Sequence, residues 1–479
     1  MRNGQRRKTI VVHVGNIAIG GDNPIRVQSM ATVDTNDTEG CVAQAKRIID
    51  AGGELVRFTT QGTREAENMK NISARLKADG YMTPLVADVH FTAHTADVAA
   101  QYCEKVRINP GNYVDPGRTF KHLEYTDVEY QEELKKIEAK LIPFINICKE
   151  HHTAVRIGVN HGSLSDRIMS RYGDTPEGIV ESCMEFLRIF RREQFDDVVI
   201  SIKASNTVVM VTTVRLLVKT MDQEDMHYPL HLGVTEAGEG EDGRIKSAVG
   251  IGALLTEGIG DTIRVSLSEE PECEIPVARK LVELIPECTR LRQEAEASIK
   301  DDTITLTLDA PDWETLQLKA AMAVGALLID RKATKFEIRG YVGTEERGSE
   351  DTILVPTYPR TPVPSKKLND LANAILQAAR IKFTKTEYIS CPGCGRTLYN
   401  LQDTIRLIKE ATKDLVGLKI GIMGCIVNGP GEMADADYGY VGAGRGKISL
   451  YRQKECVEKN IPEEEAVDRL LALIRSDRG

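Results

Sequence analysis

The sequence has no long hydrophobic run, since none of its stretches approaches the ~18 consecutive apolar residues of a membrane-spanning helix. It also has no excess of positive charge. A net charge of −9 argues against general binding to nucleic acid or to an anionic membrane, because either would favour a basic face. The basic N-terminus, MRNGQRRKTIVVHV, carries an apolar stretch too short for the core of a signal peptide. We therefore expect a cytoplasmic protein without nucleic-acid or membrane partners. A small anionic ligand is still compatible with the negative net charge, because its binding site needs only local positive charge.

Histidine is missing from the second half of the chain, because all nine histidines lie at or before His231. Ten cysteines without a secretory signal indicate reduced thiols, some of them candidate metal ligands. Six cysteines stand singly in apolar or helical context and are expected to be small core residues: Cys41, Cys103, Cys148, Cys183, Cys273 and Cys288. The remaining cysteines, all in the C-terminal region, cannot be completed to a mixed cysteine–histidine zinc site there.

Short β-branched runs alternate with longer helical patterns from residue 25 to about 285. Helical spacing is found, for example, at 38–51, 64–79, 176–193 and 243–258. The strand candidates are PIRVQSM, ELVRFTT, PLVADVHF, KVRINP, AVRIGVNH, DVVISIKAS, PLHLGVTEAG and DTIRVSLS. Eight strand–helix units of this kind imply parallel pairing and favour a (β/α)8 TIM barrel, with an open doubly wound sheet as the alternative. The preceding VHVGNIAIGG is expected to be a hairpin that closes the barrel bottom.

A chain of 479 residues fits two or three domains. We expect an α/β protein with the barrel in residues 1–290, a small inserted α/β segment and linker in 291–375, and an α+β domain in 376–479. Residues 113–152 form a charged, helical excursion between two barrel strands. The middle segment (residues 291–375) holds two or three strands and a helix, but it is far too short for a second barrel of ~250 residues.

Cations occur inside the apolar strand runs, near the strand ends that carry the working face of such a barrel. Burial of a cation there costs several kcal/mol unless an anion compensates it. Each could pair with a buried carboxylate such as Asp88 or Glu236, but the carboxylates are too few, and a bound phosphate or diphosphate fits better. The cations are Arg57, Arg107, Arg156, Lys203 and Arg264.

Neutral polar residues lie two to four positions beyond these cations and could add hydrogen-bond donors: Asn109, Asn160 and Ser266. His90 follows Asp88 at a strand end, where it is either a satisfied core histidine or part of the same site. Arg26 fits the cation pattern too, with a structural role equally expected.

The C-terminal cysteines have ligand-like spacing. CPGC places Cys391 and Cys394 in a tight turn, and Cys425 follows in GIMGCIVNGPGE. Zinc, an iron–sulfur cluster and a redox disulfide all use such spacing. The loop after Cys425 offers backbone N–H groups and the Glu432 carboxylate, whereas Cys456 lies in a polar, helical context and is interpreted as a bystander. A cluster with three thiolates and one weaker ligand keeps an iron that can exchange an oxygen ligand, which four thiolates would prevent.

Taken together, these segments resemble the family of 4-hydroxy-3-methylbut-2-enyl diphosphate synthases of the non-mevalonate isoprenoid pathway. The resemblance covers residues 11–285 and 376–450 and rests on an ordered set of motifs: PIRVQSM, VADVHF, EKVRINPGN, RIGVNHGSL, SIKAS, TEAG, IRVSL, CPGCGR and GCIVNGPGE. It implies an oxidoreductase that opens and reductively dehydrates a small cyclic diphosphate, 2-C-methyl-D-erythritol 2,4-cyclodiphosphate. The two electrons would come singly from reduced ferredoxin or flavodoxin.

The resemblance also implies roles for individual residues. A [4Fe–4S] cluster would be held by Cys391, Cys394, Cys425 and Glu432, and Glu236 would be the carboxylate near the reacting carbons. The substrate-binding set consists of Arg57, Asp88, His90, Arg107, Asn109, Arg156, Asn160, Lys203, Arg264, Ser266 and Asn428.

The excursion at 113–152 is typical of the long, three-domain members of the family, whose middle domain is a whole barrel. The middle segment of this chain departs from that pattern because it is too short for a barrel. In compact members the cluster domain caps the barrel of a homodimer partner, and in long members capping within one chain is expected. Two other hypotheses remain: a barrel hydrolase or aldolase for phosphorylated sugars with a structural zinc knuckle, and a non-enzymatic sensor.

Overall fold

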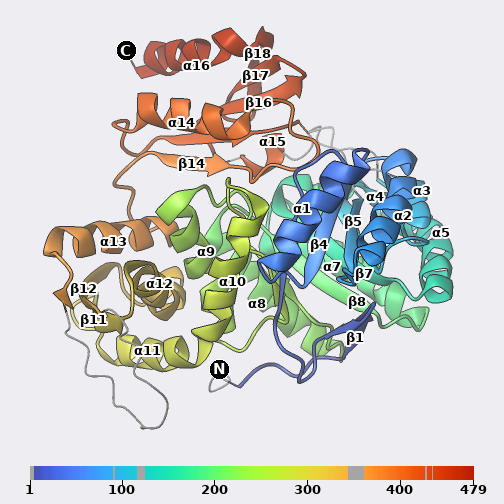
Figure 1. Cartoon of the computed structure of the whole chain (residues 1–479), viewed down its shortest axis with the longest axis horizontal. Helices are drawn as coiled ribbons and strands as arrows, with labels where there is room; N and C mark the ends of the chain where they lie inside the picture. The colour runs from blue at the N-terminus through green and yellow to red at the C-terminus, as the bar shows by residue number, and fades with distance from the viewer. Residues whose placement is uncertain are drawn as a thin grey trace.

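A computed structural model of the chain describes residues 5–89, 92–115, 124–343, 361–426, 429–433 and 435–478. A barrel, a small middle segment beside it and a C-terminal domain above the barrel mouth are visible in Figure 1. No helix in these residues has the length and apolar character needed to cross a membrane.

The barrel is built from eight parallel strands in the order β8-β7-β6-β5-β4-β3-β10-β9. A parallel bridge between Ile200 and Leu230 joins the two ends of this order, so the sheet closes as a barrel. The predicted TIM barrel is confirmed, and the open sheet is excluded. The strands are β3 (Arg26–Met30), β4 (Leu55–Thr60), β5 (Leu85–Val89), β6 (Lys105–Ile108), β7 (Ala154–Asn160), β8 (Val198–Lys203), β9 (His231–Leu232) and β10 (Thr262–Ile263).

The expected hairpin closes the bottom of the barrel. It consists of β1 (Val12–Val14) and β2 (Ile17–Ile19), which pair antiparallel. Its buried Val12, Val14 and Ile19 pack against the lowest inward-facing residues of the barrel strands. Within the described ranges, the bottom is therefore sealed by apolar contacts, and the opposite end is the open one.

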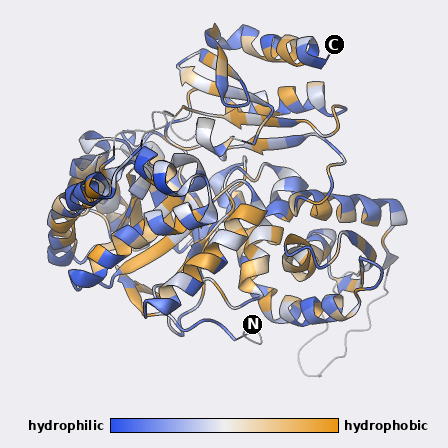
Figure 2. Cartoon of the chain, turned by 180° about the vertical axis from the view of Figure 1, so that it is seen from behind, coloured by the Kyte–Doolittle hydropathy of each residue, from blue (hydrophilic) through white to orange (hydrophobic). Residues whose placement is uncertain are grey.

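Helices surround the barrel, with hydrophilic residues on their outward faces (Figure 2). Local signals fix where they begin: Asp37 accepts a hydrogen bond from the Gly40 N–H at the start of α1, and Thr175 caps α7 just before Pro176. The barrel helices are α1 (Thr38–Asp50), α2 (Thr63–Ala78), α3 (Ala93–Ala99), α4 (Pro110–Tyr113), α5 (Asp127–His151), α6 (Asp166–Tyr172), α7 (Pro176–Arg192), α8 (Thr207–Gln223), α9 (Gly240–Leu255) and α10 (Glu274–Glu283).

The expected helical excursion is confirmed as α5, a long helix that starts at a capping box formed by Thr126 and Glu129. It packs on the outside of the barrel against α3 and α7. A buried ion pair of 2.7 Å between Arg167 and Glu185 lies beneath it, and the Tyr130 hydroxyl of α5 donates to the same glutamate. Helix α5 therefore adds to the outer wall of the barrel.

The middle segment is a small α/β unit, as expected, and not a barrel. In it, β11 and β12 pair parallel and β13 adds antiparallel to β12. The Pro-rich exit is not wholly a linker, because Thr361–Pro362 is β13 and α13 starts at Ser365. The elements are α11 (Ile285–Ala297), β11 (Thr303–Ala310), α12 (Trp313–Ile329), β12 (Lys335–Val342), β13 (Thr361–Pro362) and α13 (Ser365–Ala378).

Helix α12 attaches this segment to the barrel. Nearly all of its residues are buried, and it is apolar around most of its circumference, as a helix enclosed on all sides must be. It packs closely along α9 because glycines let the two backbones approach: Gly252 faces Met322, and Gly325 faces Val249. The middle segment is thus fixed to the barrel by a close-packed helix pair.

The C-terminal domain, called the cap domain here (residues 387–478), has a five-stranded sheet in the order β14-β15-β16-β17-β18. The first three strands pair parallel and the last two antiparallel. This is the expected α+β domain. Its elements are β14 (Glu387–Ser390), α14 (Leu401–Thr412), β15 (Lys419–Met423), α15 (Gly429–Glu432), β16 (Tyr438–Gly444), β17 (Lys447–Arg452), β18 (Glu455–Pro462) and α16 (Glu463–Arg478).

Candidate active site

The inward-facing side chains of the barrel form layers, because every second residue of a strand points to the barrel axis. The lowest apolar members pack on the β1–β2 hairpin, and they are Leu55, Val86, Ala154 and Val199. Two positions further along the same strands, the side chains are polar or charged: Arg57, Asp88, Arg156 and Ser201. The two-residue period of the strands therefore aims the predicted cations into the barrel.

A cavity lies at the barrel mouth, between the strand ends and the cap domain. All five predicted cations line it, together with Asp88, Asn160, Glu236 and Ser266. The cap domain contributes the three predicted cysteine ligands to the opposite wall: Cys391, Cys394 and Cys425. The structure thus brings the two groups of candidate residues, which are far apart in the sequence, to one cavity.

The five cations exceed their carboxylate partners. Asp88 lies 3.2 Å from Arg107 and 3.7 Å from Arg57. Within the described residues, neither Arg156 nor Lys203 has a carboxylate at ion-pair distance. The cavity therefore carries surplus positive charge that a bound anion can neutralise.

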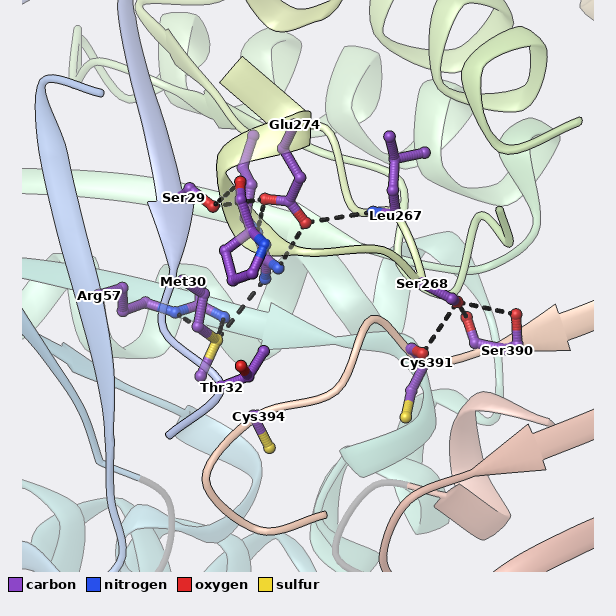
Figure 3. Close-up of polar contacts among 12 residues, drawn as sticks. Ser29, Met30, Thr32, Arg57, Leu267, Ser268, Glu274, Ser390, Cys391 and Cys394 are labelled. Carbon is purple, nitrogen blue, oxygen red and sulfur yellow. Dashed lines mark hydrogen bonds and ion pairs between the residues drawn. The ribbon is translucent and has the colours of Figure 1, made fainter. Parts of the chain in front are cut away.

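The donors of Arg57 show how incompletely these cations are satisfied. Its Nη2 and Nε lie 2.8 and 3.2 Å from the Met30 Sδ. Figure 3 shows the two side chains in contact. A thioether is a weak acceptor, so this arginine has donors to offer a stronger one. Burial lowers its pKa to about 10, although Asp88 acts in the opposite direction. Burial, reinforced by the neighbouring arginines, holds the pKa of Lys203 well below its ordinary value.

Arg264 differs from the other cations because it has a full partner. Glu274 accepts from its Nε at 3.0 Å and from its Nη2 at 2.9 Å, and the same carboxylate accepts from the Ser29 hydroxyl and the Leu267 N–H (Figure 3). Burial acts to lower the pKa of Arg264, but Glu274 outweighs it and the pKa is raised. The ion pair between Arg264 and Glu274 therefore fixes the position of one of the five cations that line the cavity.

Replacement of Glu274 by glutamine should strongly destabilise the fold, because it leaves a buried guanidinium without its counter-charge. We expect the free energy of unfolding to fall by ~3 kcal/mol, measured by denaturant unfolding. Glu138→Gln is the control, since it breaks the exposed pair between Glu138 and Arg192 and should change stability by less than ~1 kcal/mol. Equal effects of the two substitutions would contradict the assignment.

The cap domain lies on the barrel of its own chain. Ser390 forms a parallel bridge with Ala237, and the Ser268 hydroxyl donates to the Cys391 carbonyl at 3.0 Å (Figure 3). Ion pairs at the edge of the contact join Lys409 to Glu239 at 2.9 Å and Lys246 to Glu387 at 3.2 Å. Strand ends, backbone and charged side chains thus all hold the cap over the barrel mouth.

The three cavity cysteines come from two loops of the cap sheet. Cys391 and Cys394 follow β14, with Gly393 in the left-handed region at φ +79°, and Cys425 follows β15. The Gly424 N–H donates to the Cys391 sulfur at 3.2 Å, and burial raises the pKa of that thiol to about 12. A thiolate there needs a cation beside it, and a cavity wall with three sulfurs and backbone donors suits an iron–sulfur cluster. The three thiols are therefore the donor type that such a cluster uses, but within the described residues no three candidate ligands are gathered closely enough to hold a single metal ion.

Two predictions about other cysteines were wrong. Cys456 lies in strand β18, not in a helix, and its sulfur contacts the Glu458 carbonyl and not the cavity. Strand β18 lies at the edge of the cap sheet, where many residues are exposed and polar. The charged sequence around Cys456 therefore did not distinguish an edge strand from a helix. Cys273 is exposed in the turn before α10, whereas the other five single cysteines are buried as expected.

The carboxyl groups of Glu236 and Glu432 meet at the interface between the barrel and the cap. Glu432 is buried, accepts from the Thr235 hydroxyl at 3.0 Å and is not part of the cavity lining. Burial raises the pKa of both carboxyls, and the proximity of Glu236 raises that of Glu432 further. In this arrangement burial and mutual repulsion both disfavour the charged forms of the two carboxyls.

Some predicted residues are placed elsewhere. Asn109 caps α4 and donates to the Ser163 hydroxyl at 2.8 Å, so it shapes a loop and does not line the cavity. Arg26 pairs with Glu54 at 2.7 Å near the barrel bottom, which makes it structural. His90 and Asn428 lie outside the described residues.

Sequence reasoning missed Arg396, which lines the cavity from the cap side. It is buried, its Nε and Nη1 have no hydrogen-bond partner among the described residues, and it lies near Asp88 and the Cys425 thiol. The signal was available in CPGCGR, where an arginine stands two residues after a candidate ligand. Its role became visible only when the fold placed the barrel cations opposite it.

Comparisons with known proteins match both ends of the chain. The sequence model of the GcpE TIM-barrel domain matches residues 9–279, and that of the GcpE protein C-terminal domain matches residues 387–476. A protein of Bacteroides fragilis called 4-hydroxy-3-methylbut-2-en-1-yl diphosphate synthase (flavodoxin) is 51% identical over 622 residues, covering 99% of this chain and 96% of the relative. A Porphyromonas gingivalis protein of the same name is 45% identical over 592 residues, covering 99% and 98%.

The relatives are longer than this chain. An alignment of 622 positions against a chain of 479 residues leaves at least 143 positions without a counterpart here. Neither GcpE domain matches residues 280–386, which include the middle segment. One solved structure that resembles the chain weakly is dihydropteroate synthase from Xanthomonas albilineans, with a TM-score of 0.39 at 13% identity, over 58% of this chain and 98% of that chain.

Proposed function

The chain belongs to the GcpE family of 4-hydroxy-3-methylbut-2-en-1-yl diphosphate synthases, and we propose that the cavity between its barrel and cap domain is the active site. The enzyme is an iron–sulfur oxidoreductase that converts 2-C-methyl-D-erythritol 2,4-cyclodiphosphate to 4-hydroxy-3-methylbut-2-enyl diphosphate in isoprenoid biosynthesis. One observation carries the proposal: five barrel cations and three cap cysteines line the same cavity.

The cations bind the diphosphate of the substrate in this proposal. Arg57, Arg156 and Lys203 lack full counter-charges and would gain them from its oxygens, with Asn160 and Ser266 as neutral donors. Arg396 would reach the same group from the cap side. Binding would therefore draw the cap toward the barrel, because cations of both face a single ligand.

Cys391, Cys394 and Cys425 would hold a [4Fe–4S] cluster, with Glu432 as the fourth ligand in place of its contact with Thr235. When bound, the cluster supplies the two electrons one at a time. The relatives' name specifies flavodoxin, and we propose a reduced flavodoxin, or a ferredoxin acting in the same way, as the source of these electrons.

Glu236 is proposed as the proton donor for the oxygen that leaves as water. It lines the cavity, and its burial keeps the carboxyl protonated to a higher pH than in water. The cap closes over the barrel mouth and excludes bulk water, so this proton reaches the substrate and not the solvent.

The proposal is tested by anaerobic turnover of the cyclodiphosphate with reduced flavodoxin, alongside iron and sulfide analysis. We expect formation of 4-hydroxy-3-methylbut-2-enyl diphosphate and about four irons and four sulfides per chain. Stoichiometric zinc without sulfide, after reconstitution with iron and sulfide has been attempted, would support the hydrolase hypothesis instead.

The ligand set gives a separate prediction. Cys456→Ser should leave the iron content and the electron paramagnetic resonance spectrum of the reduced cluster unchanged, because Cys456 lies away from the cavity. Glu432→Ala should alter that spectrum while retaining iron, since it removes only the weaker ligand. Loss of the cluster in Cys456→Ser together with a normal spectrum in Glu432→Ala would assign the fourth ligand to Cys456.

A further inference from the structure

A second polar group lies in the barrel beneath the proposed diphosphate site. Lys105 stands in register with Val86 and Ala154, two members of the lowest apolar layer, so its side chain points inward like theirs. Gln28 and His231 occupy low positions on β3 and β9. None of the three lines the cavity, whose lower wall includes Arg156 and Ser201.

These side chains are buried without adequate partners. Lys105 and Gln28 have no exposed surface, and His231 has 1%. The Lys105 Nζ, both amide atoms of Gln28 and the His231 Nε2 have no hydrogen-bond partner among the described residues. An amine buried in this way costs stability, so its presence calls for a compensating interaction in another state of the protein.

The charges that act most strongly on Lys105 are positive. Arg156 on β7 and Arg57 on β4 act on it from above, and His231 on β9 faces the same space. Asp88 is engaged by Arg107 and Arg57, and Glu104 pairs with Lys77 on the outside of the barrel. Burial, followed by these arginines, holds the pKa of Lys105 well below its ordinary value.

We propose that Lys105 is a positioning residue that takes up a proton when a diphosphate enters the cavity above it, so that substrate binding adds a further cation beneath Arg156. This inference rests on the proposed function of the cavity. The negative charge of the diphosphate reverses the sign of the field at Lys105, and the low dielectric of the barrel interior transmits that change. The proton comes from the solvent, and no bond in the substrate changes.

A purely structural lysine would behave differently. If its amine supported the fold, for instance through Gln28, its removal would weaken the ligand-free protein and leave proton uptake unchanged. If it serves the bound anion, the ligand-free protein bears a cost that substitution removes. Stability without ligand and proton uptake with ligand therefore separate the two roles.

The test is calorimetric titration of the cluster-loaded protein with inorganic pyrophosphate near pH 8, in two buffers with different ionisation enthalpies. Lys105→Met should take up about one proton fewer per pyrophosphate than the wild type and should bind about tenfold more weakly. Lys77→Met is the matched control, because it removes an exposed barrel lysine, and it should behave as the wild type.

Thermal unfolding gives a second readout. Without ligand, Lys105→Met should match or exceed the wild-type melting temperature, and pyrophosphate should raise it less than in the wild type. Lys105→Gln, which keeps a polar group, should show the same loss of proton uptake and replaces Lys105→Met if that variant does not fold. Unchanged proton uptake, or a lower ligand-free melting temperature in both variants, overturns the inference. Failure of pyrophosphate to bind the wild type overturns the proposed function as well.

Discussion

A mixture of Cys391→Ser and Arg156→Met proteins should show no more turnover than either protein alone. The first variant lacks a proposed cluster ligand and the second lacks a cation of the proposed diphosphate site, so each has one intact half of the cavity. In this structure the cap and the barrel of one chain close on each other through Ser390, Ala237 and Ser268. Because both halves of an active site come from the same chain, two defective chains cannot assemble a working one.

The measurement is anaerobic turnover after co-expression or joint refolding, which allows subunits to mix. Recovery of about a quarter of wild-type activity would indicate caps exchanged between the chains of a homodimer. Wild-type protein treated identically is the control for losses during mixing. If the mixed variants gain no turnover while the wild-type control keeps its full turnover, the cap acts on the barrel of its own chain despite the shortened middle segment.

Glu236→Gln should lower kcat by about 100-fold or more while the cluster stays intact. The carboxyl is proposed to deliver a proton, and an amide of the same shape cannot. Because burial raises the pKa of Glu236, the protonated form is present below that raised pKa and is lost as the pH rises through it. Turnover by the wild type should therefore decline as the pH rises through the pKa of Glu236. The residual turnover of the Glu236→Gln variant should not show this decline.

Glu239→Gln is the matched control for this experiment. Glu239 lies on the same loop but pairs with Lys409 at the rim of the cap contact, so its substitution should change kcat only severalfold. Iron content and the reduced spectrum establish that each variant holds its cluster. Full turnover by Glu236→Gln with a normal cluster would remove the proton-donor role.

The barrel was predictable because its sequence signals are local and redundant. Each strand is a short β-branched run, each helix begins at a cap such as Asp37 or Thr175, and the strand period alone places Arg57 and Arg156 on one side. Burial then makes five cations in such strands hard to explain by the carboxylates nearby in the sequence, although the structure supplies Arg264 with a partner, Glu274, that the sequence analysis did not consider. The proposed cation site follows from these two facts.

Contacts between distant segments were not predictable in the same way. Arg396 follows CPGC in the sequence, but nothing local states that it faces Asp88. The paired carboxyls of Glu236 and Glu432 and the structural role of Asn109 likewise depend on how the cap lies on the barrel. Domain boundaries also depend on tertiary contacts that the sequence does not state. Because α13 still packs on the middle segment, we propose that the cap domain begins after the connecting residues 379–386.

The close packing of α12 on α9 has a consequence for how the cap finds its barrel. The middle segment is held to the barrel up to Ala378, and only residues 379–386 connect it to β14. Eight residues span at most roughly 28 Å when extended. Such a tether gives the cap an effective concentration in the millimolar range at its own barrel. A foreign cap at micromolar protein concentration cannot compete, so turnover per chain should not change when the enzyme is diluted.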